Sequence, residues 1–236
     1  MLINDDCFNV FPKIKNNSID LVFADPPYFL SNNGLSIHSG KIVSVNKGEW
    51  DKESVQGDMN DFNYRWLSQC FRVLKESGSI YVTGTKHNIF NVKENMEKIG
   101  FHIINIIIWH KVDPPPLIYK NKYRFSYEFI IFASKTKNYY FNFEYLKSIS
   151  NKEMDDVWEL PSVSIKEKKC GYHPTQKPLC LLDRIINASS KSNDIVLDPF
   201  LGSGTTAVSA LKNKRRILGI EKDSKFYIIS KKRISF

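Results

Sequence analysis

The sequence predicts an α/β protein with a doubly wound, mostly parallel sheet and helices on both faces. Apolar, β-branched runs of strand length alternate along the chain with segments whose apolar residues recur at helical spacing. The chain has 236 residues, of which 42% are hydrophobic. That is enough to bury the core of one domain with a small insertion.

The strands come first in the argument because their apolar runs are bounded by turn residues. The predicted strands are Ile19–Ala24, Ser79–Thr83, His102–Lys111, Tyr127–Ser134, Ile195–Asp198 and Arg216–Ile220. Among them, the stretch His102–Ser134 is also compatible with an antiparallel pair. The apolar residues of these runs are interpreted as core and are assigned no function.

Two helices follow from apolar residues at helical spacing. The first is predicted from Phe62, Trp66, Cys70, Val73 and Leu74, with Gly78 as its stop signal. The second is predicted from Leu179, Leu182, Ile185 and Ile186 and leads into the strand at Ile195. Each helix connects two predicted strands, as a parallel sheet requires.

Two segments interrupt this alternation. Ser31–Asp58 is rich in Ser, Asn, Gly and Lys, and a loop of this length is functional or disordered. We interpret it as a flap over a bound base or DNA, with Trp50 and Lys52 as contacts; a disordered insertion is the alternative. Residues 138–172 mix Lys with Tyr and Phe and form the second irregular segment.

Charge and cysteine content limit the classes of partner and location. The formal net charge of +9 favours a polyanionic partner, although solvated surface lysines explain it equally well. Four scattered cysteines without a C-x-x-C pair are typical of a reducing cytoplasm. We expect no signal peptide and no membrane span, since the longest apolar stretch, near Ile103–Trp109, is short and contains Asn105.

The segment Asp25-Pro26-Pro27-Tyr28 directly follows a predicted strand. Open α/β sheets bind ligands at the carboxyl edge, to which this strand delivers it. The prolines fix φ, so that an exocyclic NH2 group could donate to the Asp25 carboxylate and the Pro26 carbonyl while Tyr28 stacks on the base. Taken alone, the segment is more simply a turn carboxylate followed by a rim aromatic.

A second segment, from Val196 to Thr206, has the pattern of a strand, a glycine turn and a helix start. The next predicted strand ends before Glu221, whose carboxylate is placed to accept hydrogen bonds from ribose hydroxyls. The two segments together indicate a nucleoside cofactor and an amino-group substrate.

These two segments and the block from His173 to Pro178 resemble the β class of S-adenosylmethionine-dependent DNA amino-methyltransferases. The matching motifs are DPPY, then H-x-T-Q-K-P, then D-P-F-x-G-S-G-T-T, in the order of the β class. The resemblance covers essentially the whole chain. It implies a single methyltransferase domain over 1–236 with a seven-stranded sheet. Residues 1–137 would form the catalytic half, 138–172 a small target-recognition segment and 173–236 the cofactor half.

The resemblance also implies a set of site residues. The catalytic residues would be Asp25, Pro26, Pro27 and Tyr28. S-adenosylmethionine would be held by Asp6, Cys7, Asp25, His173, Thr175, Asp198, Phe200, Gly202, Ser203, Gly204, Thr205 and Glu221. The DNA contacts would include Trp50, Lys52, Lys120, Lys122 and Arg124. No metal is needed, and we discount a zinc site at Cys170, His173 and Cys180 because the family block already accounts for His173.

The implied reaction is methyl transfer to adenine N6 in a short DNA sequence by a cytoplasmic companion of a restriction endonuclease. Asp at the first motif position favours adenine, with N4 of cytosine as the alternative. The segment Phe29–Asn32 resembles adenine methylases that accompany restriction enzymes, including GATC-directed ones. The target sequence, the choice between single- and double-stranded DNA, and homodimerisation stay open.

Three rival functions differ in what they leave unexplained. A nicotinamide-dependent dehydrogenase would use Gly202, Gly204 and Ala207 as G-x-G-x-x-A, but it leaves Asp25–Tyr28 without a role. A nucleoside triphosphatase lacks the G-x-x-x-x-G-K-[ST] motif. An inactive nucleic-acid-binding module conflicts with the intact catalytic tetrapeptide.

Overall fold

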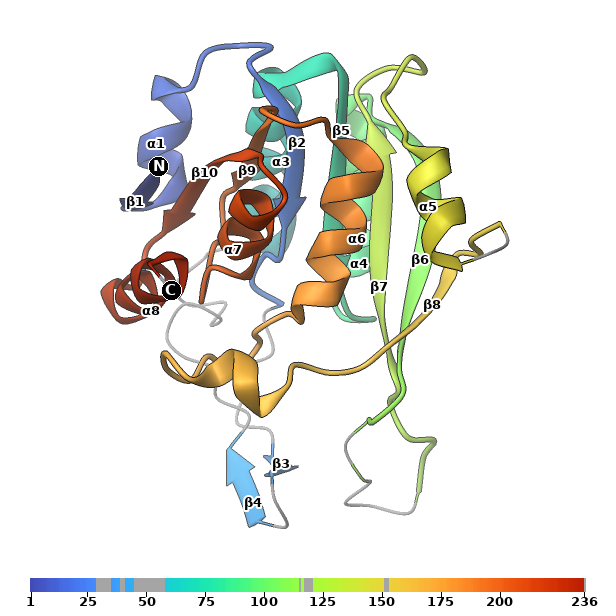
Figure 1. Ribbon diagram of the computed structural model, residues 1–236, viewed down its shortest axis with the longest axis vertical. Helices are drawn as coiled ribbons and strands as arrows, with labels where there is room; N and C mark the ends of the chain where they lie inside the picture. The colour runs from blue at the N-terminus through green and yellow to red at the C-terminus, as the bar shows by residue number, and fades with distance from the viewer. Residues whose placement is uncertain are drawn as a thin grey trace.

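The protein is described by a computed structural model in which an eight-stranded mixed sheet is covered by helices on both faces (Figure 1). The model describes residues 1–28, 35–38, 41–44, 58–114, 116, 121–150 and 153–235, and at 35–38 and 41–44 only the backbone is described. In this part of the chain no helix has the length and apolar character needed to cross a bilayer.

The strand order of the main sheet is β1-β10-β9-β2-β5-β7-β6-β8. In chain order the strands are β1 (Leu2–Asn4), β2 (Ile19–Ala24), β5 (Leu74–Gly84), β6 (His102–Lys111), β7 (Tyr127–Ser134), β8 (Val157–Leu160), β9 (Ile195–Asp198) and β10 (Arg216–Glu221). All neighbouring pairs are parallel except β5–β7 and β6–β7. The predicted α/β class and the antiparallel pair within His102–Ser134 are therefore confirmed.

The sheet has eight strands where seven were expected, and two of them were not predicted. β1 and β8 comprise three and four residues, too short to show a period-2 pattern. Each is a strand because a longer neighbour pairs with it, β10 for β1 and β6 for β8.

The helices separate into two layers, one on each face of the sheet (Figure 1). One hydrophobic core contains residues of α1 (Cys7–Val10), α3 (Met59–Val73) and α4 (Ile89–Ile99). The other contains residues of α6 (Leu179–Ser189) and α7 (Thr205–Lys212), with α8 (Ser224–Ile234) packed against α7 and α5 (Phe143–Ser150) against α6. Short 3-10 turns cover Phe11–Lys13 and Ile165–Lys168.

The first predicted helix ends earlier than its pattern suggested. Asp58 caps the start of α3 through hydrogen bonds from the N–H groups of Asn60 and Asp61, and Leu74 is already extended with ψ 135°. Gly78 was predicted to stop this helix but lies inside β5. A Cβ there would come within 2.8 Å of the Leu74 side chain and 3.0 Å of the Asp20 carbonyl oxygen. Gly78 therefore permits close strand contact rather than ending a helix.

The two irregular segments are not simple loops. Within 31–58, β3 (Leu35–His38) and β4 (Lys41–Ser44) form an antiparallel hairpin, which corrects the prediction of a segment without secondary structure. The predicted DNA contacts Trp50 and Lys52 lie outside the described residues. Within 138–172, α5 and β8 belong to the helix layer and the sheet, and the target-recognition role of this segment stays a prediction.

Candidate functional site

A pocket opens at the carboxyl edge of three adjacent parallel strands, β2, β9 and β10. Asp25 follows β2, while Asp198 and Glu221 are the last residues of β9 and β10. Because parallel strands end at one edge, these three carboxyl groups meet in the same pocket. Its volume is about 860 Å³ including the open mouth, within the size range of cofactor sites.

Most of the residues predicted to hold the cofactor line this pocket. They are Asp6, Cys7, Asp25, His173, Thr175, Asp198, Phe200, Gly202, Ser203, Thr205 and Glu221. Gly204 does not line the pocket, which corrects its assignment. It is the N-cap of α7 with φ 83°, and a Cβ there would lie 2.7 Å from Ser230 Cβ. Its role is helix packing.

The glycine turn after β9 is held by backbone geometry at Gly202. The φ of Gly202 is 54°, and its N–H donates to Glu221 Oε2 at 2.7 Å. A Cβ at this position would lie 3.0 Å from His173 Nε2. Gly202 therefore allows the turn, the carboxyl group of Glu221 and the imidazole of His173 to approach one another closely.

Arg233 supports the same turn from α8 and was not predicted. Its side chain is buried, and Nη1 donates to the Ser203 carbonyl oxygen at 3.0 Å, to Ser203 Oγ at 3.1 Å and to Thr205 Oγ1 at 2.9 Å. The arginine lies in a run of basic residues near the end of the chain, so composition alone did not distinguish it from its exposed neighbours.

Asp198 and Glu221 have unusual electrostatics for exposed-edge carboxyl groups. Burial raises the pKa of each to about 7, against the opposing effect of hydrogen bonds to the charged form. For Asp198 these bonds come from Thr206 and the Phe200 N–H, and for Glu221 from the N–H groups of Asp223 and Gly202. Both groups are therefore poised between the neutral and the ionised form near neutral pH.

The amino-terminal wall of the pocket is formed by Asp6 and Cys7. Asp6 caps α1 by accepting from the Phe8 N–H, and Lys222 Nζ donates to its second oxygen at 2.9 Å. Cys7 is buried, and burial raises the pKa of its thiol well above the ordinary value. These residues begin a helix and also line the pocket.

His173 closes the pocket from the segment before α6. Its ring packs edge-on against Phe226 with 4.1 Å between centroids, and its Nδ1 accepts from the Thr175 N–H at 3.3 Å. Burial lowers the pKa of His173 to about 4. The imidazole is therefore neutral at physiological pH.

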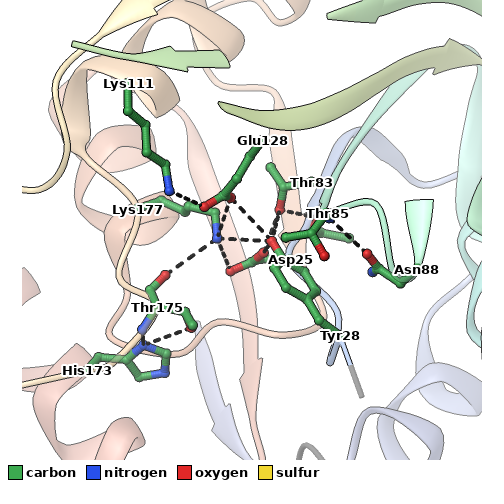
Figure 2. Close-up of polar contacts among 11 residues, drawn as sticks. Asp25, Tyr28, Thr83, Thr85, Asn88, Lys111, Glu128, His173, Thr175 and Lys177 are labelled. Atoms are coloured by element: carbon green, nitrogen blue, oxygen red, sulfur yellow. Dashed lines mark hydrogen bonds and ion pairs between the residues drawn. The ribbon is translucent and has the colours of Figure 1, made fainter. Parts of the chain in front are cut away.

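Asp25 lies at the other end of the pocket, where its carboxyl group is held by three donors (Figure 2). Oδ1 accepts from Thr83 Oγ1 at 2.6 Å and from the Tyr28 hydroxyl at 2.5 Å, and Oδ2 accepts from Lys177 Nζ at 2.6 Å. Pro27 lines the pocket beside Asp25. The two hydrogen bonds to Oδ1 leave Oδ2 with the remaining acceptor capacity.

The predicted open stacking face of Tyr28 is not present in this structure. Tyr28 is 5% exposed, does not line the pocket and points its hydroxyl at Asp25. Stacking of Tyr28 on a base therefore requires the side chain to move. Pro26 is also not among the residues that line the pocket.

Sequence reasoning missed the polar partners of Asp25. Thr83 and Glu128 lie on predicted strands, and Lys177 lies in the block from His173 to Pro178, but none received a role. A signal did exist, because charged residues in otherwise apolar strands are buried only when paired. Among the predicted DNA contacts, Lys122 and Arg124 are exposed between β6 and β7 and away from the pocket lining, while Lys120 lies outside the described residues.

Comparison with known proteins gives the same assignment as the motifs. Residues 19–232 match the model of a DNA methylase family that comprises N6 and N4 methyltransferases. The Type II methyltransferase M2.MboI of Moraxella bovis is 44% identical over 231 residues, which are 97% of this chain and 85% of that protein. The Type II methyltransferase M2.LlaDCHI of Lactococcus lactis subsp. cremoris is 45% identical over 239 residues, covering 100% and 89%.

Solved structures show the same fold. The M1.HpyAVI–SAM complex superimposes with a TM-score of 0.72 at 24% identity, covering 99% of this chain and 98% of that one. The cytosine-N4-specific PvuII DNA methyltransferase superimposes with a TM-score of 0.79 at 18% identity, covering 99% and 85%. The predicted family is confirmed, and the dehydrogenase and triphosphatase alternatives are set aside: the chain belongs to the N6/N4 DNA methylase family.

Proposed function

We propose that this protein transfers the methyl group of S-adenosylmethionine to N6 of adenine in a short DNA sequence, as the companion of a restriction endonuclease. One observation carries the proposal: the carboxyl group of Asp25 lines the same pocket as the glycine turn and Glu221. Donor and acceptor sites are thus adjacent. The net charge of +9 suits a DNA substrate, which places the protein in the cytoplasm.

The residues of the pocket fit the cofactor. Gly202 leaves room that a Cβ would fill, and Glu221 closes the pocket at the end of β10, where ribose hydroxyls are bound in related folds. Phe200, Ser203 and Thr205 line the wall of the turn. His173 and Thr175 lie between the turn and Asp25, where we place the methionine end. S-adenosylmethionine supplies an electrophilic methyl group on a sulfonium, so no metal is required.

Asp25 would act on the attacking amino group of the base. The nitrogen lone pair is delocalised into the ring, and an N–H donated to Asp25 Oδ2 favours a more pyramidal nitrogen with a freer lone pair. The carboxylate also stabilises the positive charge that develops as the methyl group arrives. The Pro26 carbonyl is the second acceptor in this proposal, and the proton leaves after transfer.

The target nitrogen lies inside duplex DNA, so the base must be extruded or the strand must be single. The 5% exposed ring of Tyr28 would then leave Asp25 and stack on the base. This movement would free an acceptor position on Asp25 Oδ1 as the amino group arrives.

Asp at the first motif position supports adenine rather than cytosine. The names of the relatives, Type II methyltransferases, support a role beside a restriction endonuclease. Methylation of cytosine N4 is the second candidate, because the same constellation could grip either amino group.

The experiment that tests this function is incubation with labelled S-adenosylmethionine and unmethylated DNA, followed by nucleoside mass spectrometry. N6-methyladenine is the expected product on duplex or single-stranded DNA. N4-methylcytosine would keep the mechanism and overturn the choice of base. The absence of any methylated nucleoside would contradict the proposed function.

Cofactor affinity is expected to rise with pH through about pH 7. Asp198 and Glu221 have pKa values raised to about 7 by burial, so both are partly protonated in the empty protein below that pH. A cationic cofactor favours their ionised forms, and binding therefore releases protons. Isothermal titration between about pH 6 and pH 8 should show a falling Kd with rising pH.

Two controls separate this effect from general pH sensitivity. S-adenosylhomocysteine lacks the sulfonium charge, and its Kd should depend less on pH. Glu221→Gln should flatten the profile for S-adenosylmethionine. The same two groups make the free energy of unfolding fall as pH rises from about 4 to about 7, because the folded state binds more protons than the unfolded state there. A Kd independent of pH would refute the linkage.

A further inference from the structure

Asp25 belongs to a cluster of buried charges that extends beyond the catalytic tetrapeptide (Figure 2). Lys177 Nζ lies 2.6 Å from Asp25 Oδ2 and 3.6 Å from Glu128 Oε2. Lys111 Nζ contacts the other oxygen of Glu128, Oε1, at 2.6 Å. The members come from β2, β6, β7 and the segment before α6, so the charge cluster joins the catalytic strand to the antiparallel part of the sheet.

Two carboxyl groups of this charge cluster converge on one hydroxyl. The Tyr28 hydroxyl lies 2.5 Å from Asp25 Oδ1 and 3.5 Å from Glu128 Oε2. The side chains of Asp25 and Glu128 are each 14% exposed, and that of Lys177 is 6% exposed. Solvent therefore screens the repulsion between the two carboxylates poorly.

Like charges that share a buried site favour uptake of a proton by one of them. A protonated Asp25 would be a poor acceptor for the amino group of a base. The ammonium group of Lys177 opposes this, because it contacts both carboxyl groups at once. Burial by itself lowers the pKa of Lys177, but Asp25 and Glu128 outweigh that effect, and its pKa lies above the ordinary value. Lys177 is therefore charged throughout the neutral range.

We propose that Lys177 is a positioning residue that keeps Asp25 ionised and its Oδ2 directed into the pocket, against the opposing charge of Glu128. The inference rests on the proposed function. Lys177 contacts Thr175 through its backbone carbonyl at 3.5 Å, so the block from His173 to Pro178 connects the cofactor wall to the catalytic carboxylate. Lys111 compensates the distal oxygen of Glu128 and does not contact Asp25 in the described interactions.

Other titratable groups near Asp25 have smaller parts. His173 faces it from the cofactor side, and burial keeps that imidazole neutral with a pKa of about 4. Asp198 faces it from β9, and its pKa is raised to about 7 mainly by burial. Tyr28 keeps its proton, because burial and then Asp25 raise its pKa well above the ordinary value. Lys177 is therefore the cation in direct contact with Asp25 among the described residues.

The test is the pH profile of kcat for Lys177→Met, which removes the charge and keeps an unbranched side chain. We expect kcat at neutral pH to fall by about 100-fold, and the acid limb of the profile to move up by about one to two pH units. Circular dichroism and thermal unfolding of the variant establish that it folds, and the Kd of S-adenosylmethionine separates loss of transfer from loss of cofactor.

Two further variants distinguish charge compensation from a structural role. Lys111→Met makes the same chemical change in the same charge cluster but away from Asp25, and should leave the acid limb within about half a pH unit. The double variant Lys177→Met with Glu128→Gln removes the opposing carboxylate as well. Its acid limb should return toward that of the wild type, which a purely structural lysine would not predict.

The outcomes separate the two proposals. Wild-type protein that methylates no DNA would contradict the proposed function. Wild-type protein that methylates DNA, together with a Lys177→Met profile equal to its own, would overturn the role of Lys177 alone. A shifted profile that the second substitution leaves unchanged would also overturn the charge compensation.

Discussion

Replacing Asp25 by alanine is expected to abolish methyl transfer while S-adenosylmethionine still binds. The carboxyl group lies at the catalytic end of the pocket, whereas the glycine turn and Glu221 form the other end. Loss of one preorganised acceptor for developing charge costs about 100- to 1,000-fold in kcat. Asp25→Ala also leaves the buried ammonium of Lys177 without its 2.6 Å partner, which lowers stability as well.

Asp25→Asn gives the cleaner kinetic measurement because it keeps the shape of the side chain. Single-turnover rates at saturating S-adenosylmethionine should fall by about 1,000-fold, with Kd changed by less than about threefold. Asp20→Asn is the matched control: it lies on the same strand, but its carboxyl group pairs with Lys75 at 2.6 Å and does not line the pocket. Normal turnover in the Asp25 variants would remove this residue from the mechanism.

The second large effect is expected for Gly202→Val, which should disrupt cofactor binding. Its φ of 54° is in the left-handed region, and the new Cβ would lie 3.0 Å from His173 Nε2. Backbone strain and overpacking together cost about 2–4 kcal/mol. If most of this cost falls on the bound state, the Kd of S-adenosylmethionine rises by roughly 100-fold.

Gly100→Val is the control for backbone strain without a pocket. Gly100 has φ 106° at the end of α4, and a Cβ there meets only Phe71 Cζ at 3.9 Å. This variant should unfold at a lower temperature but bind S-adenosylmethionine with unchanged Kd. Equal affinities of wild type and Gly202→Val, measured by isothermal titration, would contradict the assigned pocket.

Much of the fold was predictable because its strongest signals are local. The bounds of β2, β6, β7 and β9 agree with the predicted strands, since each is an apolar run closed by turn residues. α6 was found from its apolar spacing. The ends of α3 and β5 were not, because Leu74 continues the helical spacing but is extended where it pairs with Ile19.

Much of the candidate site was also visible in the motifs. Asp198, Gly202 and Glu221 line one pocket, as their strand-end positions predicted. Gly202 and Gly204 look equivalent in sequence, yet only Gly202 lines the pocket, because Gly204 is turned toward α8 and Ser230. A motif identifies which residues matter but not the direction in which each faces.

The sequence by itself determined the class of fold, the family and the two ends of the pocket, because these depend on residues that are neighbours in the chain. Only the tertiary structure decided the pairing of the short strands β1 and β8, the inward orientation of Tyr28 and the environment of Asp25. Lys177 lies 152 residues from Asp25 along the chain and contacts it only because two separate segments meet at one sheet edge. Such contacts are set by packing and by the cost of burying an unpaired charge, and neither can be read from local sequence.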